Sequence, residues 1–175
     1  PLEEALREHR ETLYKELAAA VPDPRLIELF QLKYDYHNIK AILKAERRGI
    51  SPEAFLLPGG RYDAAQLQSE WQQEHMFQVS DTARRAAQEA AALLQENDPQ
   101  GADLRLDAAC YDEMCTLAEE MKSNFLQGYV RQLIDAIDTV DDGTAITNLI
   151  QQLREASNAA DKTSESIGGI ADATK

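Results

Sequence analysis

The spacing of apolar residues predicts helices along most of the chain. Over the first twenty residues, apolar side chains and one histidine recur at steps of three and four, which is typical of one face of an amphipathic helix. The residues on this face are Leu2, Leu6, His9, Leu13, Leu17 and Ala20. Pro22 and Pro24 end the pattern. Because His9 lies on the apolar face, we expect it to be a core residue whose polar atoms are satisfied.

A second helix is predicted from about residue 25 to 48. Its apolar residues form two stripes rather than one, which indicates a central helix packed from both sides. Asp23 followed by Pro24 is a typical helix start, since a carboxylate can cap the first turn and proline fits the first helical position. Gly49 is well placed to end the helix in a left-handed conformation.

Further helices follow a linker over residues 50–63, which holds one short helical turn from Ser51 and a break at Pro58-Gly59-Gly60. Cap candidates and apolar stripes predict them over about 64–75, 82–96, 106–121, 124–140 and 145–160. The cap candidates are Asp63, Ser80 or Asp81, and Ser123. Residues 97–101 are predicted to be a loop. Alanines in the fourth helix favour close contact with a neighbouring helix.

We therefore predict an all-α fold, a multi-helix bundle of about seven helices. Residues 76–80 are the nearest approach to a strand and are too short to build a sheet. We expect two related helical units, residues 1–62 with their linker and residues 63–160. Residues 161–175 are rich in small and polar residues, and we expect this tail to be frayed or disordered.

The two units are suggested by a weak internal repeat with a displacement of one hundred residues. Asp23 falls on Ser123, and both are cap candidates. Each copy then reads as a capped helix with an acidic residue in its middle. The corresponding pairs include Phe30 with Val130, Asp35 with Asp135, and Asn38 with Asp138. A duplicated unit of this length would set the whole architecture.

The net charge of −13, from 31 acidic and 18 basic residues, argues against nucleic acid as a partner, since an acidic surface repels phosphates. Lys44, Arg47 and Arg48 form one short basic run, which suits the carboxyl end of a helix. No stretch approaches the roughly 18 apolar residues of a membrane span, and no signal peptide is seen. Because the first residue is Pro1 rather than Met, we expect a fragment or processed product.

The histidines and cysteines indicate neither a metal site nor a disulfide. His9, His37 and His75 lack the spacing of helical metal ligands. Cys110 and Cys115 are five residues apart on one predicted helix and point in different directions, so we expect reduced core thiols, as in a cytosolic protein. Gly59-Gly60 lacks the lysine of a phosphate-binding loop. We therefore expect no cofactor and no small-molecule substrate.

The polar residues in the middle of the second helix are the strongest candidate site. Asp35 and Asn38 are three residues apart and share one face of the helix, while Lys40 lies away from them. A buried carboxylate needs partners. We interpret Asp35, Asn38, Lys40 and the equivalent Asp135 as structural residues that fix helix packing, and we assign no catalytic residue.

The segment Leu29–Ala45 resembles a signature of the C subunit, called d in eukaryotes, of the A/V-type rotary ATPases. The matching positions are Tyr34, Asp35, Asn38 and Lys40. The loop Phe55–Asp63 also resembles this family, and so do three short segments of the second unit: Leu106-Asp107 with Tyr111, Phe125-Leu126, and Tyr129-Val130 through Ile134-Asp135. The resemblance covers about residues 1–140. It departs at Asp138, where the family usually has asparagine.

The resemblance implies a mechanical function. Members of this family are non-catalytic adaptors between the central rotor shaft and the membrane ring of proteolipid subunits, on the cytoplasmic side of the membrane. They are about twice as long as this chain and have three related helical units. The expected partners are thus the rotor-shaft and ring subunits, with no nucleic acid and no direct membrane span.

Two other classes of function stay open at the level of sequence. The chain could be an unrelated helical domain that binds or regulates another protein. It could also be a small helical enzyme that uses Asp35 and His37, which would require a concave pocket shared by these two residues.

Overall fold

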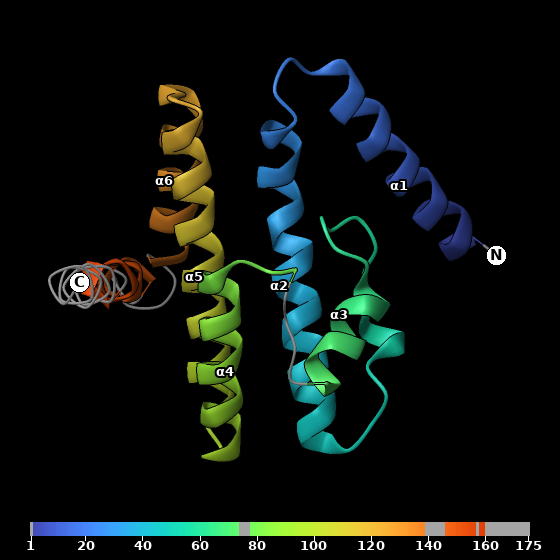
Figure 1. The fold of residues 1–175 in the computed structure, drawn as a ribbon, viewed down its shortest axis with the longest axis vertical. Helices are drawn as coiled ribbons and strands as arrows, with labels where there is room; N and C mark the ends of the chain where they lie inside the picture. The colour runs from blue at the N-terminus through green and yellow to red at the C-terminus, as the bar shows by residue number, and fades with distance from the viewer. Residues whose placement is uncertain (1, 74–77, 139–145, 157, 160–175) are drawn as a thin grey trace, which may run out of the picture.

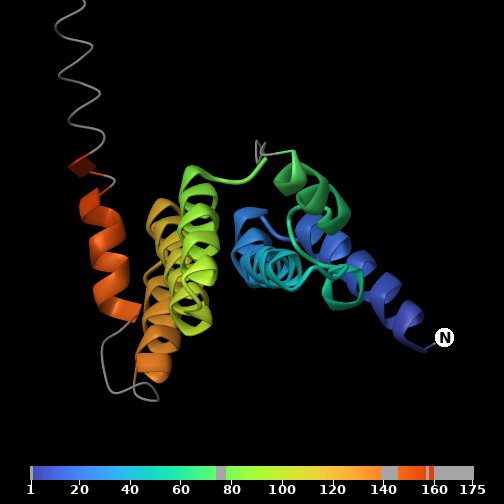
Figure 2. The same cartoon turned by 90° about the horizontal axis from the view of Figure 1, so that it is seen from below.

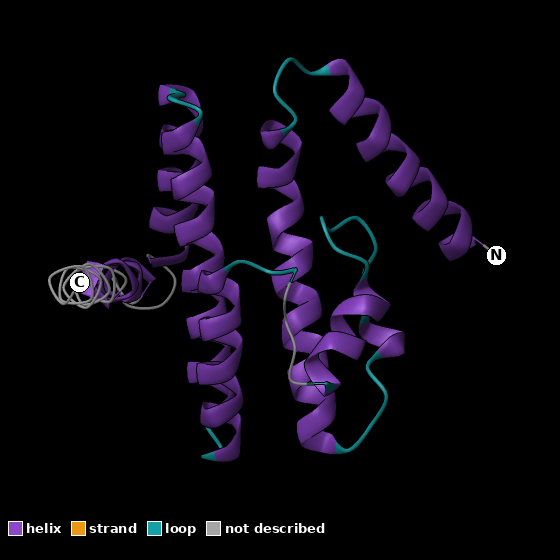
Figure 3. Ribbon diagram, in the orientation of Figure 1, coloured by secondary structure: helices purple, strands orange, loops and turns teal. Residues whose placement is uncertain are grey.

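The computed structural model describes residues 2–73, 78–138, 146–156 and 158–159, and within these ranges the chain is helical with no strand (Figure 3). The predicted all-α fold is therefore confirmed. The α-helices are α1 (Leu2–Ala20), α2 (Arg25–Arg48), α3 (Ala64–Gln72), α4 (Asp81–Gln95), α5 (Pro99–Glu120) and α6 (Asn124–Asp138), with a short 3-10 helix η1 (Glu53–Phe55) and a last helical segment over 146–156.

Helix α2 lies in the middle of the molecule, with α1 and α3 on one side and α4, α5 and α6 on the other (Figures 1 and 2). Its buried apolar residues point to both sides, as the two predicted stripes require, and include Ile27, Leu29, Leu32, Tyr36, Ile39 and Leu43. Asp23 Oδ1 accepts a hydrogen bond from the Arg25 amide at 3.0 Å. Gly49 ends the helix with φ of 67°, the left-handed conformation that glycine adopts without strain.

Helices α4 and α5 form the closest helix pair. Their contact is built from alanines that are 0–2% exposed: Ala83, Ala86, Ala87 and Ala90 from α4, and Ala102, Ala108 and Ala109 from α5. Small side chains let two helix backbones approach closely, as the alanine-rich sequence predicts. Helix α2 packs against both helices of this pair.

The amino end of α5 corrects the predicted loop over residues 97–101. The helix already begins at Pro99, and Asp98 caps it by accepting a hydrogen bond from the Gly101 amide at 2.8 Å. Proline has no amide hydrogen to lose in the first turn, so the Pro-Gln-Gly sequence that resembles a loop is compatible with a helix start. Asp63, Ser80 and Ser123 accept hydrogen bonds from the first turns of α3, α4 and α6, as predicted.

Helix α1 packs loosely, and the prediction that His9 is a core residue is wrong. His9 is exposed, and Leu13 and Leu17 are 43% and 39% exposed. α1 diverges from α2 (Figure 1), so that contact is made near its carboxyl end, where the ring of Tyr14 meets that of Tyr34 edge-on at 6.1 Å. The amphipathic pattern is real, but within the described part of the chain no helix covers it.

The 146–156 helix packs on α5 and α6. Ile146, Ile150 and Leu153 are at most 9% exposed, and Arg154 Nε lies 2.7 Å from Asp112 Oδ1 of α5. Several predictions fall outside the described residues: the end of the third helix toward residue 75, His75, part of the 76–80 segment, the break over 141–144, and the tail 161–175. Cys110 and Cys115 are both free thiols, as expected.

Candidate functional site

Asn38 joins α2 to the loop that follows η1. Its side chain is fully buried, with its Nδ2 donating to the Leu57 carbonyl at 2.8 Å and its Oδ1 accepting from the Leu57 amide at 2.8 Å. A carboxamide can serve both groups at once because it carries a donor and an acceptor side by side. The loop backbone, which has no sheet or helix partner here, is thereby satisfied.

Asp35 lies one helical turn earlier and binds the same loop further along. Its Oδ2 accepts from Arg61 Nε at 2.8 Å, and its Oδ1 accepts from the Tyr62 amide at 3.3 Å. Only 1% of Asp35 is exposed. Burial raises the pKa of this carboxyl above its usual range, and the hydrogen bond from Arg61 opposes that rise.

Glu113 of α5 completes a network that the sequence does not reveal. Arg61 Nη2 donates to Glu113 Oε2 at 3.1 Å, and the Tyr36 hydroxyl donates to Oε1 at 3.1 Å. Ser80, the capping residue of α4, also donates to Oε1. Burial raises the pKa of Glu113, with Arg61 acting in the opposite direction. The buried carboxylate of Asp35 and the partly buried carboxylate of Glu113 thus share one guanidinium and hold α2, α4, α5 and the loop together.

Lys40 lies on a different face of α2 and pairs with α5. Its Nζ is 2.6 Å from Asp107 Oδ1, and one turn later Lys44 Nζ is 2.6 Å from Asp103 Oδ2. The two pairs run along the contact between the helices. Since all four side chains are partly exposed, each pair contributes only modestly.

The fourth predicted site residue, Asp135, is exposed on α6 and does not occupy a position equivalent to Asp35. The buried acid of α6 is Asp138, which is 6% exposed. Its carboxylate accepts hydrogen bonds from the Ile146 amide at 2.9 Å and the Thr147 amide at 3.3 Å. Of the two acids three residues apart on α6, Asp138 is buried and Asp135 is exposed. The packing role expected for Asp135 stays a prediction.

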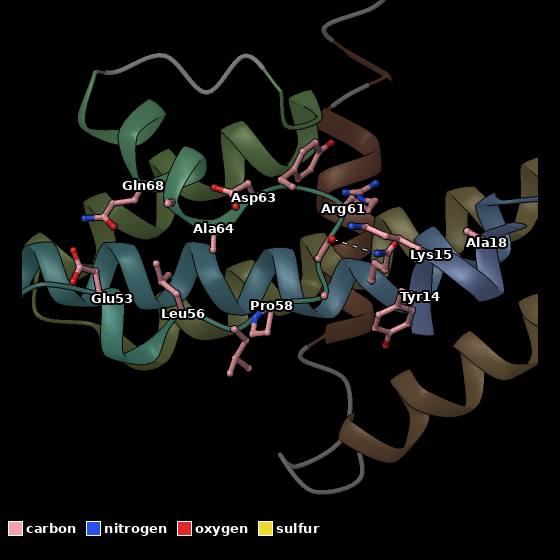
Figure 4. A pocket seen from close by; sticks show the side chains of 16 residues that line it. Tyr14, Lys15, Ala18, Glu53, Leu56, Pro58, Arg61, Asp63, Ala64 and Gln68 are labelled. Carbon is pink, nitrogen blue, oxygen red and sulfur yellow. Dashed lines mark hydrogen bonds between the residues drawn. The ribbon is translucent and has the colours of Figure 1, made fainter. Parts of the chain in front are cut away.

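A pocket of about 790 Å³ opens beside this network, between α1 and the loop over residues 56–63 (Figure 4). Tyr14, Lys15 and Ala18 of α1 form one wall, and Arg61 faces them from the loop. Gln31 of α2 donates to the Gly60 carbonyl at 3.2 Å and closes the floor. The lining is mixed in polarity, with charges of both signs.

The arrangement does not form the acid–base pair that an enzyme using Asp35 and His37 would need. Asp35 is buried against Arg61, whereas His37 is exposed and its Nε2 lies 3.1 Å from the Phe55 carbonyl. Residues two apart on a helix point in different directions, and neither of the two pockets beside α2 is lined by both Asp35 and His37. The described geometry therefore does not supply the shared pocket that this enzyme hypothesis requires.

Neither a metal site nor a membrane span is found among the described residues. They hold no group of three or more histidine, cysteine, aspartate or glutamate side chains arranged to bind a metal ion. Within the same part of the chain, no helix combines the length and the apolar character needed to cross a membrane.

Comparison with known proteins gives a family and one curated relative. Residues 1–140 match the model of the ATP synthase (C/AC39) subunit family. The chain is 23% identical over 150 residues to the C subunit of the V-type sodium ATPase of Enterococcus hirae, a match that covers 85% of this chain and 43% of that relative. The chain thus spans less than half the length of this relative. No solved structure matches it significantly.

The family match covers the whole candidate site, from α1 through Asp35, Asn38 and Arg61 to Glu113 and α6. It also agrees with the resemblance of the α2 segment and excludes the alternative of a helical domain unrelated to rotary ATPases. The chain belongs to the ATP synthase (C/AC39) subunit family.

Proposed function

We propose that this chain is part of a non-catalytic adaptor that links the central rotor shaft of a rotary ATPase to the proteolipid ring in the membrane. The observation that carries the proposal is the family match over residues 1–140. We place the adaptor on the cytoplasmic side as a peripheral part of the complex. Its partners would be the shaft and ring subunits, and ATP hydrolysis or synthesis would occur in other subunits.

The geometry of the candidate site supports a holding function rather than chemistry. The polar atoms of Asp35, Asn38 and Glu113 bind groups of the same chain: Arg61, backbone groups of the loop, and the hydroxyls of Tyr36 and Ser80. A catalytic group must have access to a substrate, whereas Asp35 is 1% and Asn38 0% exposed. Such groups give a fixed arrangement of helices, and an adaptor that passes torque needs one.

We further propose that Asp35, Asn38 and Lys40 fix the packing of α2, with Asp138 doing so in α6. Asp35→Ala would leave Arg61 facing Glu113 without its nearest partner. Breaking a buried ion pair on one side costs about 3 kcal/mol or more of unfolding free energy, measurable by urea denaturation. His37→Ala, an exposed neighbour on the same helix, is the matched control. If both variants unfolded like the unsubstituted chain, the packing role would be wrong.

The proposal that the chain holds two related units, 1–62 and 63–160, has one structural support. Asn38 and Asp138 are one hundred residues apart, both are buried, and each binds backbone amides of the segment that follows its helix. In both helices a buried polar side chain thus binds the backbone of the following segment, although Asn38 is an amide and Asp138 an acid.

Co-purification tests the adaptor function. The native polypeptide that contains this chain would carry an affinity tag and be co-expressed with the shaft and ring subunits of its source organism. We expect recovery of both in a stable complex. A matched sample lacking the ring subunits should still recover the shaft. Recovery of neither, from a preparation that retains ATPase activity, would contradict the proposal.

A further inference from the structure

A groove is lined by residues of α2, α5 and α6, and it shares Tyr36 and Lys40 of α2 with the candidate site. Its volume is about 380 Å³. The lining is largely aromatic and apolar, with Phe30 on α2, Tyr111 and Met114 on α5, and Tyr129 and Leu133 on α6. The rings of Phe30 and Tyr129, 5.9 Å apart at their centroids, connect the two walls.

An exposed aromatic side chain extends this apolar lining beyond the groove. Phe125 of α6 is 79% exposed, the largest exposure among the exposed large hydrophobic residues of the described chain. Phe125, Tyr129 and Leu133 are spaced four residues apart and therefore lie on one face of the helix. An exposed aromatic residue next to an apolar groove is typical of a protein-binding surface.

The α2 side of the groove is basic. Lys33, His37 and Lys40 lie at helical positions i, i+4 and i+7 and all line the groove. Lys40 is paired with Asp107, but Lys33 has no carboxylate within ion-pair distance among the described residues, and its Nζ lies 5.0 Å from the centre of the Tyr34 ring. Asp107 also lines the groove and neutralises Lys40, so Lys33 is the cation of this edge that remains to pair with an acidic group of a partner.

The shape of the groove selects among possible ligands. Its volume is near the lower limit of small-molecule pockets, roughly 300–1,000 Å³, and suits a few inserted side chains. The exposed ring of Phe125 lies beyond it, so a ligand that covers both must be longer. A straight groove bounded by two helices accommodates a third helix through residues at i, i+3, i+4 and i+7.

We propose that the α2–α6 groove binds an amphipathic helix of a partner protein, with apolar side chains over Tyr111 and Tyr129 and carboxylates along the Lys33–Lys40 edge. This inference rests on the proposed adaptor function, because it assigns the adaptor one binding surface and the chemistry of the partner that binds there. It does not depend on which neighbouring subunit supplies the helix.

A peptide experiment tests the chemistry directly. The probe is a fluorescent helical peptide of about 20 residues with a leucine stripe flanked by glutamates. The control peptide has the same sequence with lysine at every glutamate position. We expect the acidic peptide to bind the intact chain about tenfold more tightly than the lysine peptide, as measured by fluorescence anisotropy. We also expect the affinity of the acidic peptide to fall as the salt concentration is raised. Equal binding of both peptides, or binding of neither, would overturn the proposal.

Variants then locate the binding. Phe125→Ser is expected to lower the affinity of the chain for the acidic peptide about tenfold. Lys33→Glu is expected to lower it about fivefold. The matched controls are Phe55→Ser, an exposed phenylalanine outside the groove, and Lys15→Glu, which makes the same charge change on α1. Circular dichroism verifies folding. Peptide binding weakened by the controls but not by the groove variants would place the site elsewhere and refute the inference.

Different experimental results would contradict the groove inference and the proposed adaptor function. If the native subunit recovers its partners and Phe125→Ser and Lys33→Glu together leave that recovery and peptide binding unchanged, the groove inference is wrong and the adaptor function stands. If the unsubstituted subunit recovers no partner while the peptide still discriminates by charge, the groove stands and the adaptor function is wrong.

Discussion

At the scale of single residues, a missing side chain at position 60 permits a buried carboxylate at position 35. A Cβ atom on Gly60 would lie 2.3 Å from Asp35 Oδ1, closer than any real contact. The carboxylate could not easily move away, because Arg61 and the Tyr62 amide hold both of its oxygens. Gly60 is thus required for its smallness, as part of the same site as Asp35.

We therefore expect Gly60→Ala to lower the free energy of unfolding by about 2 kcal/mol, the usual effect of overpacking, in urea denaturation. Gly128→Ala is the matched control. Gly128 lies in α6 with nothing within 4 Å of the added methyl group, so alanine should stabilise that helix by up to about 1 kcal/mol. If both substitutions changed stability in the same direction, the close contact at Gly60 would be refuted.

The shared guanidinium predicts a pH dependence of stability. Burial raises the folded-state pKa values of Asp35 and Glu113, so the folded chain holds protons that the unfolded chain releases. The contribution of each group to stability is then complete at acid pH. It is lost as pH rises from the ordinary carboxyl pKa through the raised folded value.

Glu113→Gln separates this effect from other titrating groups. Glutamine keeps an acceptor for Tyr36 and Ser80 but does not ionise. We expect the unfolding free energy of the variant, relative to the unsubstituted chain, to increase as the pH of chemical denaturation is raised from about 4 to about 7. Glu89→Gln on α4 makes the same change at an acid that pairs with Arg105 rather than Arg61, and it is the matched control. A relative stability of Glu113→Gln that fell with pH would mean that the pKa shift has the opposite sign.

At the scale of elements, Asp138 connects two successive helices. It is the last residue of α6, yet its carboxylate binds the first amides of the 146–156 helix. Removing it would leave the Ile146 amide, in a fully buried residue, without its acceptor.

We expect Asp138→Ala to destabilise the chain by about 1–3 kcal/mol, the range for a buried unsatisfied donor, as measured by urea denaturation. Asp135→Ala removes an exposed acid from the same helix and should change stability by well under about 1 kcal/mol. The reverse order would assign the packing role to Asp135 instead.

The ends of elements are the part of the fold that the sequence predicts well. Capping is a local interaction between residues two or three apart, so Asp63, Ser80 and Ser123 can be recognised from sequence alone. The two-sided burial of α2 is equally readable, because its apolar stripes are a property of one helix. The start of α5 is harder, since Asp98 and Pro99 form a cap that resembles a loop.

The network around Arg61 cannot be predicted in the same way. Asp35 and Asn38 are recognisable as buried polar residues, but Glu113 is 52 residues from Arg61 and carries no local signal that distinguishes it from other acids of α5. Asp135 and Asp138 are three residues apart on α6, and their spacing does not show which of them another element covers. His9 shows the converse error, because an amphipathic pattern does not say whether another helix covers it.

At the scale of the molecule, α1 is the element least fixed to the rest. Leu13 and Leu17 are partly exposed, and the ring of Tyr14 contacts that of Tyr34 on α2. Amide protons of helices with few buried apolar contacts exchange by local opening. We expect those of α1 to exchange with deuterium much faster than those of α2 and α5, as measured by mass spectrometry. Equal protection would mean that α1 is part of the cooperative core.

The pocket and the groove lie on opposite sides of α2. The pocket beside α1 and Arg61 is on one side, and the groove with Phe30, Lys33 and Tyr129 is on the other.

The central position of α2 has a mechanical consequence. A helix of 24 residues is about 36 Å long. This one is held over its middle and carboxyl half, by the Asp35 and Asn38 hydrogen bonds on one side and by the Lys40 and Lys44 ion pairs on the other. A helix that is held at several points bends less than a helix that is held only at its two ends. A load applied to the groove would therefore displace α2 and the 56–63 loop as a single stiff body.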